Sequence, residues 1–255
     1  MTDLKALIFD VDGTLADTEK DGHRVAFNLA FKEAGLSWNW NIETYGDLLR
    51  VTGGKERMVE YANRINALGS NADERWEKAV ELHKIKTRHY LNTVRNGKLP
   101  LRPGVKRLLD EARQAGLRLA IATTTTPENV TELLTATLGK ESLDWFEVIA
   151  AGDIVPAKKP APDIYSHTLK LMDLPAEECL ALEDSAPGYL SSTGAGIRTL
   201  VTVNAYTKNA EFGGNATIVN HLGDADNSCE VIAGADASKG FIDIDYLRTY
   251  HAGKQ

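Results

Sequence analysis

A short apolar run near the beginning of the chain ends on one aspartate, and a second aspartate follows two positions later. The run Leu4–Asp10 is followed by Val11, Asp12, Gly13 and Thr14. Because alternate residues of an extended chain point to the same side, the two carboxylates can face one small site. Carboxylates so close repel each other unless a cation lies beside them, and Mg²⁺ is a divalent ion that prefers oxygen ligands of this kind.

The two residues after the second aspartate suit an anion. Gly13 permits a tight turn out of the strand. Thr14 can donate its hydroxyl and backbone N–H groups to a bound anion. A carboxylate pair, a divalent cation and an anion-binding turn together indicate phosphoryl transfer through an aspartate.

The composition is that of an ordinary globular protein, and it narrows the class of partner. The 255 residues are 43% hydrophobic and 25% charged, enough for one large domain or for a core with an inserted module. The formal net charge of −7 argues against general nucleic-acid binding. It does not exclude an anionic substrate, because distant surface charge is screened beyond a Debye length of about 8 Å.

The sequence also bears on location and partners. No run approaches the roughly 18 apolar residues of a membrane span, and no signal peptide precedes the first apolar run. The simplest interpretation is a cytoplasmic protein, although a protein of the plastid stroma whose transit peptide had been removed would look the same. We expect a monomer that acts on a small molecule, with neither a nucleic acid nor a membrane as partner.

Strand-like and helix-like patterns alternate along most of the chain. The strand-like runs are Leu4–Asp10, Leu117–Thr123, Phe146–Ala150, Cys179–Glu183 and Thr199–Val203. Helical patterns lie between the later runs, which predicts an α/β fold with a parallel sheet. Ligands of such sheets bind at the carboxyl ends of the strands. Polar residues stand at three of these ends, namely Asp10, Thr123 and Glu183 with Asp184.

The first and second runs are about a hundred residues apart, far too many for a single crossover helix. The segment 18–93 has its own apolar periodicity and holds three of the four tryptophans. We therefore predict a helical cap of residues 18–93, inserted into a discontinuous core of residues 1–17 and 94–255. From about residue 207 the signal weakens. Residues 224–238 are polar and acidic, which predicts a loop or mobile tail, and residues 241–246 fit an edge strand or a packing anchor.

Four motifs in chain order carry a resemblance to a known family. They are Asp10-Val11-Asp12-Gly13-Thr14, Ala122-Thr123-Thr124, Lys159-Pro160 and Glu183-Asp184. With them the chain resembles phosphatases of the haloacid dehalogenase superfamily. The resemblance implies a Rossmann-like parallel-sheet core with an inserted α-helical cap.

The resemblance also implies the catalytic roles. Asp10 is the expected nucleophile, which forms an aspartyl-phosphate, and Asp12 is the expected general acid and base. Asp12 favours a phosphatase or phosphomutase, because dehalogenases of the superfamily lack an aspartate at that position. Lys159 would neutralise the phosphoryl group and orient Asp10. Lys158 competes for this role, but only Lys159 directly precedes Pro160 as in the family.

The other motif residues are expected to bind the phosphoryl group and the cation. Thr123 would bind the phosphoryl oxygens through its hydroxyl, and Thr124 lies just before an expected helix amino terminus, where it would contact the substrate. Glu183 and Asp184 would complete the shell of a Mg²⁺ ion together with Asp10 and the backbone carbonyl of Asp12.

The predicted cap contains candidate substrate-binding residues in two places. Glu19 and His23 are four residues apart and would share one face of a helix. Farther along, Gly53, Gly54, Lys55 and Arg57 place two cations and exposed backbone at a turn before a helix. From the residues alone, a second anion site and a glycine hinge with solvated charges are equally good interpretations.

A narrower resemblance favours the anion site. The segments that carry it are Ala16-Asp17-Thr18-Glu19, Gly22-His23-Arg24, Thr52-Gly53-Gly54-Lys55-Glu56-Arg57 and Ala150-Ala151-Gly152-Asp153. They resemble the CbbY-type branch, whose best-known members are xylulose-1,5-bisphosphate phosphatases that remove an inhibitor of Rubisco. The resemblance implies that the 1-phosphate binds at Asp10 and Mg²⁺, and that the cap residues engage the sugar and its distal phosphate.

Three other functions remain open at this point. A β-phosphoglucomutase shares the core motifs and the cap, and one sequence does not measure how readily an aspartyl-phosphate loses its phosphoryl group to water. A general sugar-phosphate phosphatase is opposed only by the Gly-Gly-Lys-Glu-Arg segment. A non-catalytic binding protein on the same fold is disfavoured by the intact set of Asp10, Asp12, Lys159 and Asp184.

Overall fold

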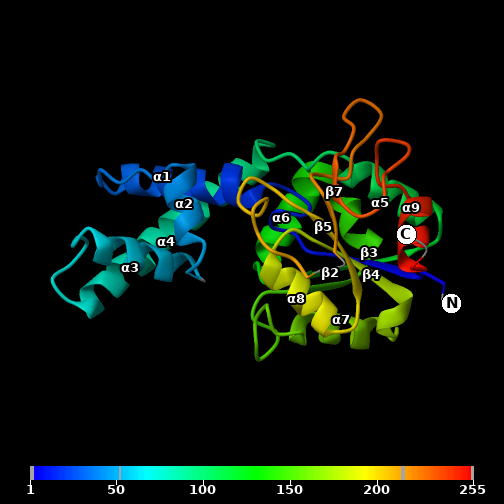
Figure 1. The fold of residues 1–255 in the computed structure, drawn as a ribbon. Helices are drawn as coiled ribbons and strands as arrows, with labels where there is room; N and C mark the ends of the chain where they lie inside the picture. Colours follow the sequence, from blue (N-terminus) through cyan, green and yellow to red (C-terminus); the bar gives the residue numbers. More distant parts are fainter. Residues whose placement is uncertain (1–2, 52, 214–215, 254–255) are drawn as a thin grey trace. The chain divides into compact units, whose positions relative to one another are not determined.

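The computed structural model describes residues 3–51, 53–213 and 216–253 and separates the chain into two compact units (Figure 1). The first unit comprises residues 1–17 and 100–255, and the second comprises residues 18–99. The expected end of the cap, at residue 93, falls inside a helix, α4 (Ala72–Arg95). The second unit continues a few residues beyond that helix.

A seven-stranded sheet forms the centre of the first unit, in the order β3-β2-β1-β4-β5-β6-β7. Neighbouring strands pair in parallel from β3 through β6, and β7 is antiparallel to β6. The five expected strands are present. The strands are β1 (Ala6–Phe9), β2 (Arg118–Thr123), β3 (Phe146–Ala151), β4 (Cys179–Glu183), β5 (Arg198–Thr202), β6 (Thr217–Val219) and β7 (Val231–Ala233).

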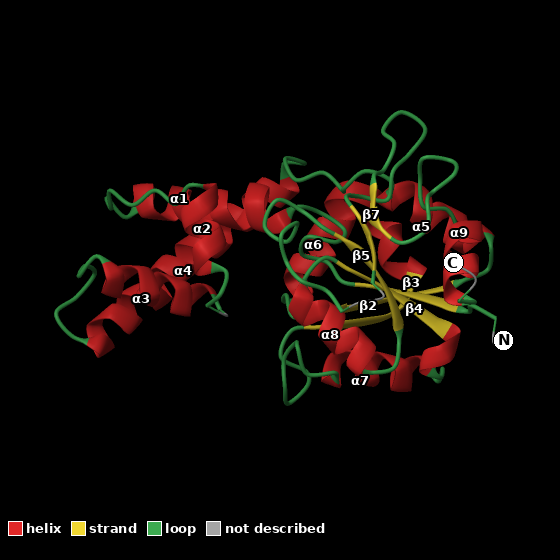
Figure 2. Cartoon of the chain, viewed as in Figure 1, coloured by secondary structure: helices red, strands yellow, loops and turns green. Residues whose placement is uncertain are grey.

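Helices cover both faces of this sheet (Figure 2). They are α5 (Val105–Gln114), α6 (Pro127–Leu138), α7 (Asp163–Met172), α8 (Ala186–Gly194) and α9 (Ile244–His251), with short 3₁₀ helices at Lys140–Trp145 and Ala176–Glu178. The chain moves outward in one direction from β1 to β3, and in the other from β4 to β5. Parallel sheets bind ligands at such a reversal, outside the carboxyl ends of the strands. In this sheet the reversal lies between β1 and β4.

Strand alternation determines which side chains meet at that reversal. Alternate residues of the central strands, including Ala6 and Ile8 of β1 and Cys179 and Ala181 of β4, pack in one apolar cluster with residues of α7. Asp10 and Glu183 continue these two series by one step each. We therefore expect both carboxylates on the face of the sheet that α7 covers.

The C-terminal segment corrects the expectation of a structureless tail. Within residues 224–238, the strand β7 pairs with β6, which the sequence pattern had not indicated either. Residues 241–246 form no strand, because Asp243 caps the amino terminus of α9 by accepting a hydrogen bond from the Tyr246 N–H group (2.8 Å). Ile242, Ile244 and Leu247 are buried, so this end of the chain is a packing anchor.

The second unit is helical. Its elements are a π-helical turn (Thr18–His23), α1 (Arg24–Glu33), α2 (Ile42–Leu48), α3 (Gly54–Arg64) and α4. An aromatic cluster forms its core, in which the rings of Phe27 and Phe31 pack against Trp40 at centroid distances of 4.8 Å. Of the helices within the described residues of the chain, none is both long and apolar enough to cross a membrane.

Candidate active site

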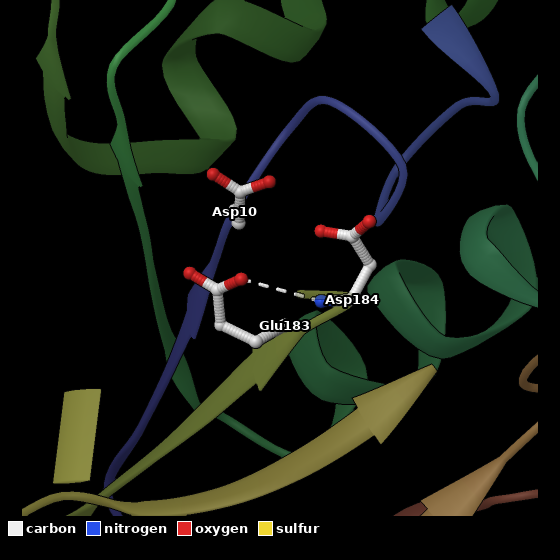
Figure 3. Close-up of side chains that lie close together, drawn as sticks. All are labelled: Asp10, Glu183 and Asp184. Atoms are coloured by element: carbon white, nitrogen blue, oxygen red, sulfur yellow. Dashed lines mark hydrogen bonds between the residues drawn. The ribbon is translucent and has the colours of Figure 1, made fainter. Parts of the chain in front are cut away.

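Three carboxyl groups converge at the carboxyl ends of β1 and β4 (Figure 3). Asp10 follows the last residue of β1, Glu183 is the last residue of β4, and Asp184 is next in the chain. One carboxylate oxygen from each lies within 4.8 Å of the others, and all three residues are buried. The register places Asp10 beside Glu183, because Phe9 pairs with Leu182.

Lys159 joins this cluster from the loop that precedes α7. Its Nζ atom donates hydrogen bonds to Asp10 Oδ1 (2.7 Å), Glu183 Oε1 (2.5 Å) and the Ala122 carbonyl oxygen (3.0 Å). An ammonium group has three N–H donors, so all three are used. Lys158, the alternative, instead pairs with Asp153 (2.8 Å) at an exposed position. The structure thus brings Lys159, and not Lys158, to the carboxylates.

Two further side chains donate hydrogen bonds to these carboxylates. The Tyr165 hydroxyl, on the first turn of α7, donates to Glu183 Oε1 (2.6 Å) and is fully buried. Asn204, which follows β5, donates through Nδ2 to Asp184 Oδ2 (2.6 Å). Gly13 has a positive φ of 90°, and a Cβ atom there would collide with Asp184 and Asn204, so this turn requires glycine.

The remaining predicted residues of the core lie around this cluster. Asp12 is half-buried and forms an isolated bridge with Ala16, in the loop after Asp10. The Thr14 hydroxyl lies 3.5 Å from Asp10 Oδ2. Thr123 is buried at the end of β2, next to the carbonyl group that Lys159 contacts.

Thr124 is exposed in the loop that connects β2 to α6. The helix begins as expected: Thr126 is its N-cap, whose side chain accepts a hydrogen bond from the Asn129 N–H group (3.4 Å), and Pro127 is its first residue. The exposed threonine therefore lies beside a helix amino terminus, a position that suits an anion.

Burial shifts the ionisation of the cluster. Burial, together with the Glu183 and Asp12 charges, raises the pKa of Asp10 to about 7, against the opposing effect of the Lys159 ammonium. Burial likewise raises the pKa of Asp184, with a further contribution from Asp10. For Lys159, burial alone would lower the pKa, but the Asp10 and Glu183 carboxylates raise it above its ordinary value.

In the second unit, Glu19 and Arg57 belong to one polar network. The Tyr45 hydroxyl bonds to Glu19 Oε2, and Arg57 Nη1 lies 3.1 Å from the same hydroxyl and 3.7 Å from Glu19 Oε1. Arg57 Nε also donates to the Val51 carbonyl oxygen (2.9 Å). These bonds give the Arg57 side chain a fixed direction.

His23 has different neighbours from Glu19, although both lie in the same π-helical turn. Its Nδ1 atom is 2.9 Å from the Nζ atom of Lys86, and its ring stacks on that of Tyr90 at 4.1 Å. Lys86 is buried and lies over the rings of Phe27 and Tyr90, 5.1 Å from each centroid. His23 was predicted as a candidate substrate-binding residue, whereas its partner Lys86 was not predicted.

The glycine pair begins α3 as predicted, with Gly53 as the N-cap at a φ of 99° and Gly54 as the first residue. A Cβ atom on Gly54 would lie 2.8 Å from His83 Nε2, so glycine allows that ring to approach the start of the helix. The Lys55 Nζ atom lies 5.3 Å from the centroid of the Trp76 ring. Thr52, which belongs to the same motif, lies outside the described residues.

Comparisons with known proteins agree with this geometry. A family model described as haloacid dehalogenase-like hydrolase matches residues 4–196. The chain belongs to the haloacid dehalogenase-like hydrolases. The match spans the whole cap segment and the four motifs. Together with the CbbY relatives described next, it identifies the protein as a phosphatase.

Individual relatives show which members of the family this chain resembles. The chain is 50% identical to Protein CbbY of Rhodobacter capsulatus over 210 residues, which is 82% of this chain and 90% of the relative. It is 45% identical to Protein CbbY of Cupriavidus necator over 251 residues, 98% of each. A crystal structure of a mutant CbbY from Rhodobacter sphaeroides in complex with xylulose 1,5-bisphosphate is also similar. It has 42% identity and a TM-score of 0.75, and the match covers 86% of this chain and 94% of that one.

The carboxylate cluster of the hydrolase fits a divalent cation. When ionised, Asp10, Glu183 and Asp184 carry three negative charges, and Lys159 supplies one positive charge, which leaves two negative charges in a buried site. Buried charge of this size is costly unless compensated. The raised pKa values of Asp10 and Asp184 express the same cost. A Mg²⁺ ion, which prefers a few carboxylates and otherwise water or substrate oxygens, matches both the charge and the donor type.

The sequence analysis missed Tyr165, Asn204 and Lys86, the partner of His23. Asn204 could have been found in the same way as Asp10, Thr123 and Glu183, because it is a polar residue just after a core strand. Tyr165 gives no such signal, because a tyrosine on an apolar helix face is typical of a core residue. In the sequence, Lys86 looks like an exposed charge of a polar helix. Its burial follows from the packing of α4 against the π-helical turn Thr18–His23.

Proposed function

We propose that this phosphatase hydrolyses a sugar bisphosphate, removing the 1-phosphate of xylulose 1,5-bisphosphate. The observation that supports the proposal is the similarity of this chain to CbbY of Rhodobacter sphaeroides, a mutant of which has been crystallised in complex with that compound. By analogy, its role would be to remove an inhibitor of Rubisco, in the cytoplasm or in the plastid stroma. The proposal also assigns substrate chemistry to the two units.

The first chemical step belongs to Asp10. One of its carboxylate oxygens attacks phosphorus, the bond from phosphorus to the sugar oxygen breaks, and an aspartyl-phosphate forms. Lys159, which contacts Asp10 (2.7 Å), orients the nucleophile and stabilises the charge on the phosphoryl oxygens. Thr123 and Thr124 bind those oxygens. Asp12 donates its proton to the departing sugar oxygen.

The second step regenerates Asp10. The Asp12 carboxylate takes a proton from water, the water oxygen attacks phosphorus, and the bond to the Asp10 oxygen breaks to release inorganic phosphate. Mg²⁺ held by Asp10, the Asp12 carbonyl group, Glu183 and Asp184 would supply electrostatic stabilisation of the phosphoryl charge. The Asn204–Asp184 bond (2.6 Å) supports one of these ligands.

The cap residues are proposed to bind the sugar and its distal phosphate. Lys55 and the start of α3 at Gly53 and Gly54 offer a cation and backbone N–H groups. Arg57, held by Glu19 and Tyr45, presents a second cation in a fixed direction. His23 adds an imidazole group, which Lys86 orients through Nδ1 (2.9 Å).

The deciding experiment measures phosphate release with and without Mg²⁺ on a panel of sugar phosphates. The panel contains xylulose 1,5-bisphosphate, ribulose 1,5-bisphosphate as the discriminating control, and β-glucose 1-phosphate. A kcat/KM for the xylulose compound that exceeds all others by about a hundredfold or more would support the proposal. Flat, weak release would leave a general phosphatase, and conversion of β-glucose 1-phosphate without hydrolysis would indicate a mutase.

A pair of variants tests the cap. Lys55→Met should lower kcat/KM for the bisphosphate far more than for a small aryl phosphate, which has no distal group. Arg64→Met is the matched control, because Arg64 also lies on α3 but pairs with Glu60 (2.8 Å) at an exposed position. Equal losses on both substrates in Lys55→Met would contradict a role in distal-phosphate binding.

A further inference from the structure

Arg102 is a buried arginine that none of the catalytic motifs includes. Its side chain is only 6% exposed, and it follows the chain's return into the first unit. A guanidinium group keeps its charge and offers five N–H donors in a rigid plane. Burying such a group requires many acceptors, so its partners show what the position is for.

The partners of Arg102 come from three separate parts of the first unit. Nη1 bonds to the Gly13 carbonyl oxygen and to the Thr202 carbonyl oxygen (2.8 Å) and Oγ1 (3.0 Å). Nη2 donates to the Val203 and Asn220 carbonyl oxygens (2.6 Å each). The guanidinium group therefore ties the loop after Asp10 to the chain just beyond β5 and β6.

Arg102 also holds the segment that leads out of the catalytic loop. Its Nε atom lies 3.3 Å from Asp17 Oδ1, and its backbone N–H donates to the Leu15 carbonyl oxygen (2.8 Å). Beside it, Ala16 and Leu101 form an antiparallel bridge. The outgoing and returning segments of the first unit are thus fastened together at one arginine.

The position of the loop that Arg102 holds is closely constrained by its neighbours. Gly13 packs against Asp184 and Asn204, and its N–H group donates to the Ala16 carbonyl oxygen (2.8 Å). Any shift of the Gly13 peptide would move the adjoining Asp12 and disturb the Asp184 carboxylate. A displacement of about 1 Å at a reacting group can cost about a hundredfold in rate.

We propose that Arg102 is a positioning residue of the phosphatase, which holds the Gly13 peptide so that Asp12 and Asp184 keep their places. Among the described residues its side chain bonds to none of Asp10, Asp12 and Lys159, so its effect on them passes through the loop. The inference rests on the proposed roles of Asp10 and Asp12.

Arg107 provides a matched control. This half-buried arginine on α5 also bonds to backbone carbonyls of the C-terminal segment, those of Gly223 (2.9 Å) and Ile242 (2.9 Å). Within the described residues, its side chain bonds to Glu111, Leu222, Gly223 and Ile242, none of which belongs to the catalytic loop. Arg102→Met and Arg107→Met would therefore both loosen the C-terminal segment, but only the first would release Gly13.

The experiment measures the melting temperature, kcat and KM of Arg102→Met, Arg102→Lys and Arg107→Met with a small aryl phosphate and saturating Mg²⁺. We expect both methionine variants to melt at lower temperatures. In Arg102→Met, kcat should fall by about 10- to 100-fold with KM within about threefold. Arg102→Lys should recover part of the loss, since an ammonium can still bond to some of the carbonyls. Arg107→Met should keep kcat within about twofold of wild type.

Two results would overturn the inference. One is a kcat in Arg102→Met within about twofold of wild type, and the other is an equal loss of kcat in Arg107→Met. If Arg102→Met does not fold, Arg102→Lys is judged by the same criteria. Asp10→Asn in the same assay separates the two hypotheses, because activity in that variant would refute the proposed chemistry, whereas its inactivity beside a fully active Arg102→Met would refute only the role of Arg102.

Discussion

Both units of the molecule bury a lysine, but they surround it with different partners. In the core, Lys159 lies between two carboxylates and a carbonyl oxygen. In the helical unit, Lys86 contacts the His23 imidazole and lies over two aromatic rings. Carboxylates neutralise an ammonium, whereas aromatic faces attract it without cancelling its charge. The core lysine therefore balances an acidic site, whereas the contacts described for the cap lysine are with an imidazole and two aromatic rings.

The largest effect is expected from removing the nucleophile of the acidic site. Asp10→Asn should lower kcat by about 10⁴-fold or more, because an amide oxygen does not form the aspartyl-phosphate. The melting temperature should not fall, since the change removes a buried carboxyl with a raised pKa. Steady-state assays and thermal melts measure both quantities. Residual activity near that of wild type would refute the covalent mechanism.

The next largest effect concerns the core lysine. Lys159→Gln should lower kcat by about 10²- to 10³-fold, since it removes a charge aimed at the phosphoryl group. It should also raise the pKa of Asp10 above about 7, because Lys159 is the group that lowers it. The control is Lys158→Gln, whose side chain pairs with Asp153 at an exposed position. Equal losses in the two variants would show that position 159 has no special role.

A smaller effect is expected from removing the hydroxyl group that donates a hydrogen bond to Glu183 of the acidic site. Tyr165→Phe removes the hydroxyl that bonds to Glu183 (2.6 Å) and retains the ring that packs in the core. The free energy of unfolding should fall by about 1–3 kcal/mol, because a buried carboxylate loses one of its donors. Urea denaturation measures this change. An unchanged midpoint would mean that Lys159 alone satisfies that oxygen.

The smallest expected effect is a dependence of stability on pH that arises from His83 in the helical unit. Burial, together with the Lys86 and Lys55 charges, lowers the pKa of His83 to about 4. The unfolded chain, with an ordinary histidine pKa of about 6.5, binds the proton first as the pH falls. The contribution of neutral His83 is thus complete above pH 6.5 and is lost progressively towards about pH 4.

The change is expected to be on the order of 1–2 kcal/mol, because the ring is partly exposed and screening reduces the effect. Urea midpoints at pH 5 and pH 7 should differ more for wild type than for His83→Gln. The same difference in both proteins would place the pH dependence in other groups.

Local patterns in the sequence predicted much of the core. The five strands, the helix start at Thr126 and Pro127, and the glycine turn before α3 were all expected. Asp10, Thr123 and Glu183 were found because a polar residue at the end of an apolar run is a local signal, and parallel strands bring such ends to one edge of the sheet. The family resemblance then supplied roles that this pattern alone leaves open.

Short and polar elements were not predictable in this way. The strands β6 and β7 have three residues each, too few for an alternating pattern to stand out. The helix α9 follows a polar, acidic stretch, and it is stabilised by the burial of Leu247 and Tyr250 against the core. None of these three elements has an apolar periodicity that stands out, because their stability depends on residues elsewhere in the chain.

The sequence by itself determined that this protein has a parallel α/β core, an inserted helical segment and an acidic site at the ends of the strands. That Lys159 meets Asp10 across 149 positions was expected from the family resemblance and not from a local pattern. Only the tertiary structure decided that Arg102 meets the Gly13 carbonyl across 89 positions. Periodicity reports which face of an element is buried. Which residues meet across elements depends on how the elements pack, and no local pattern contains that information.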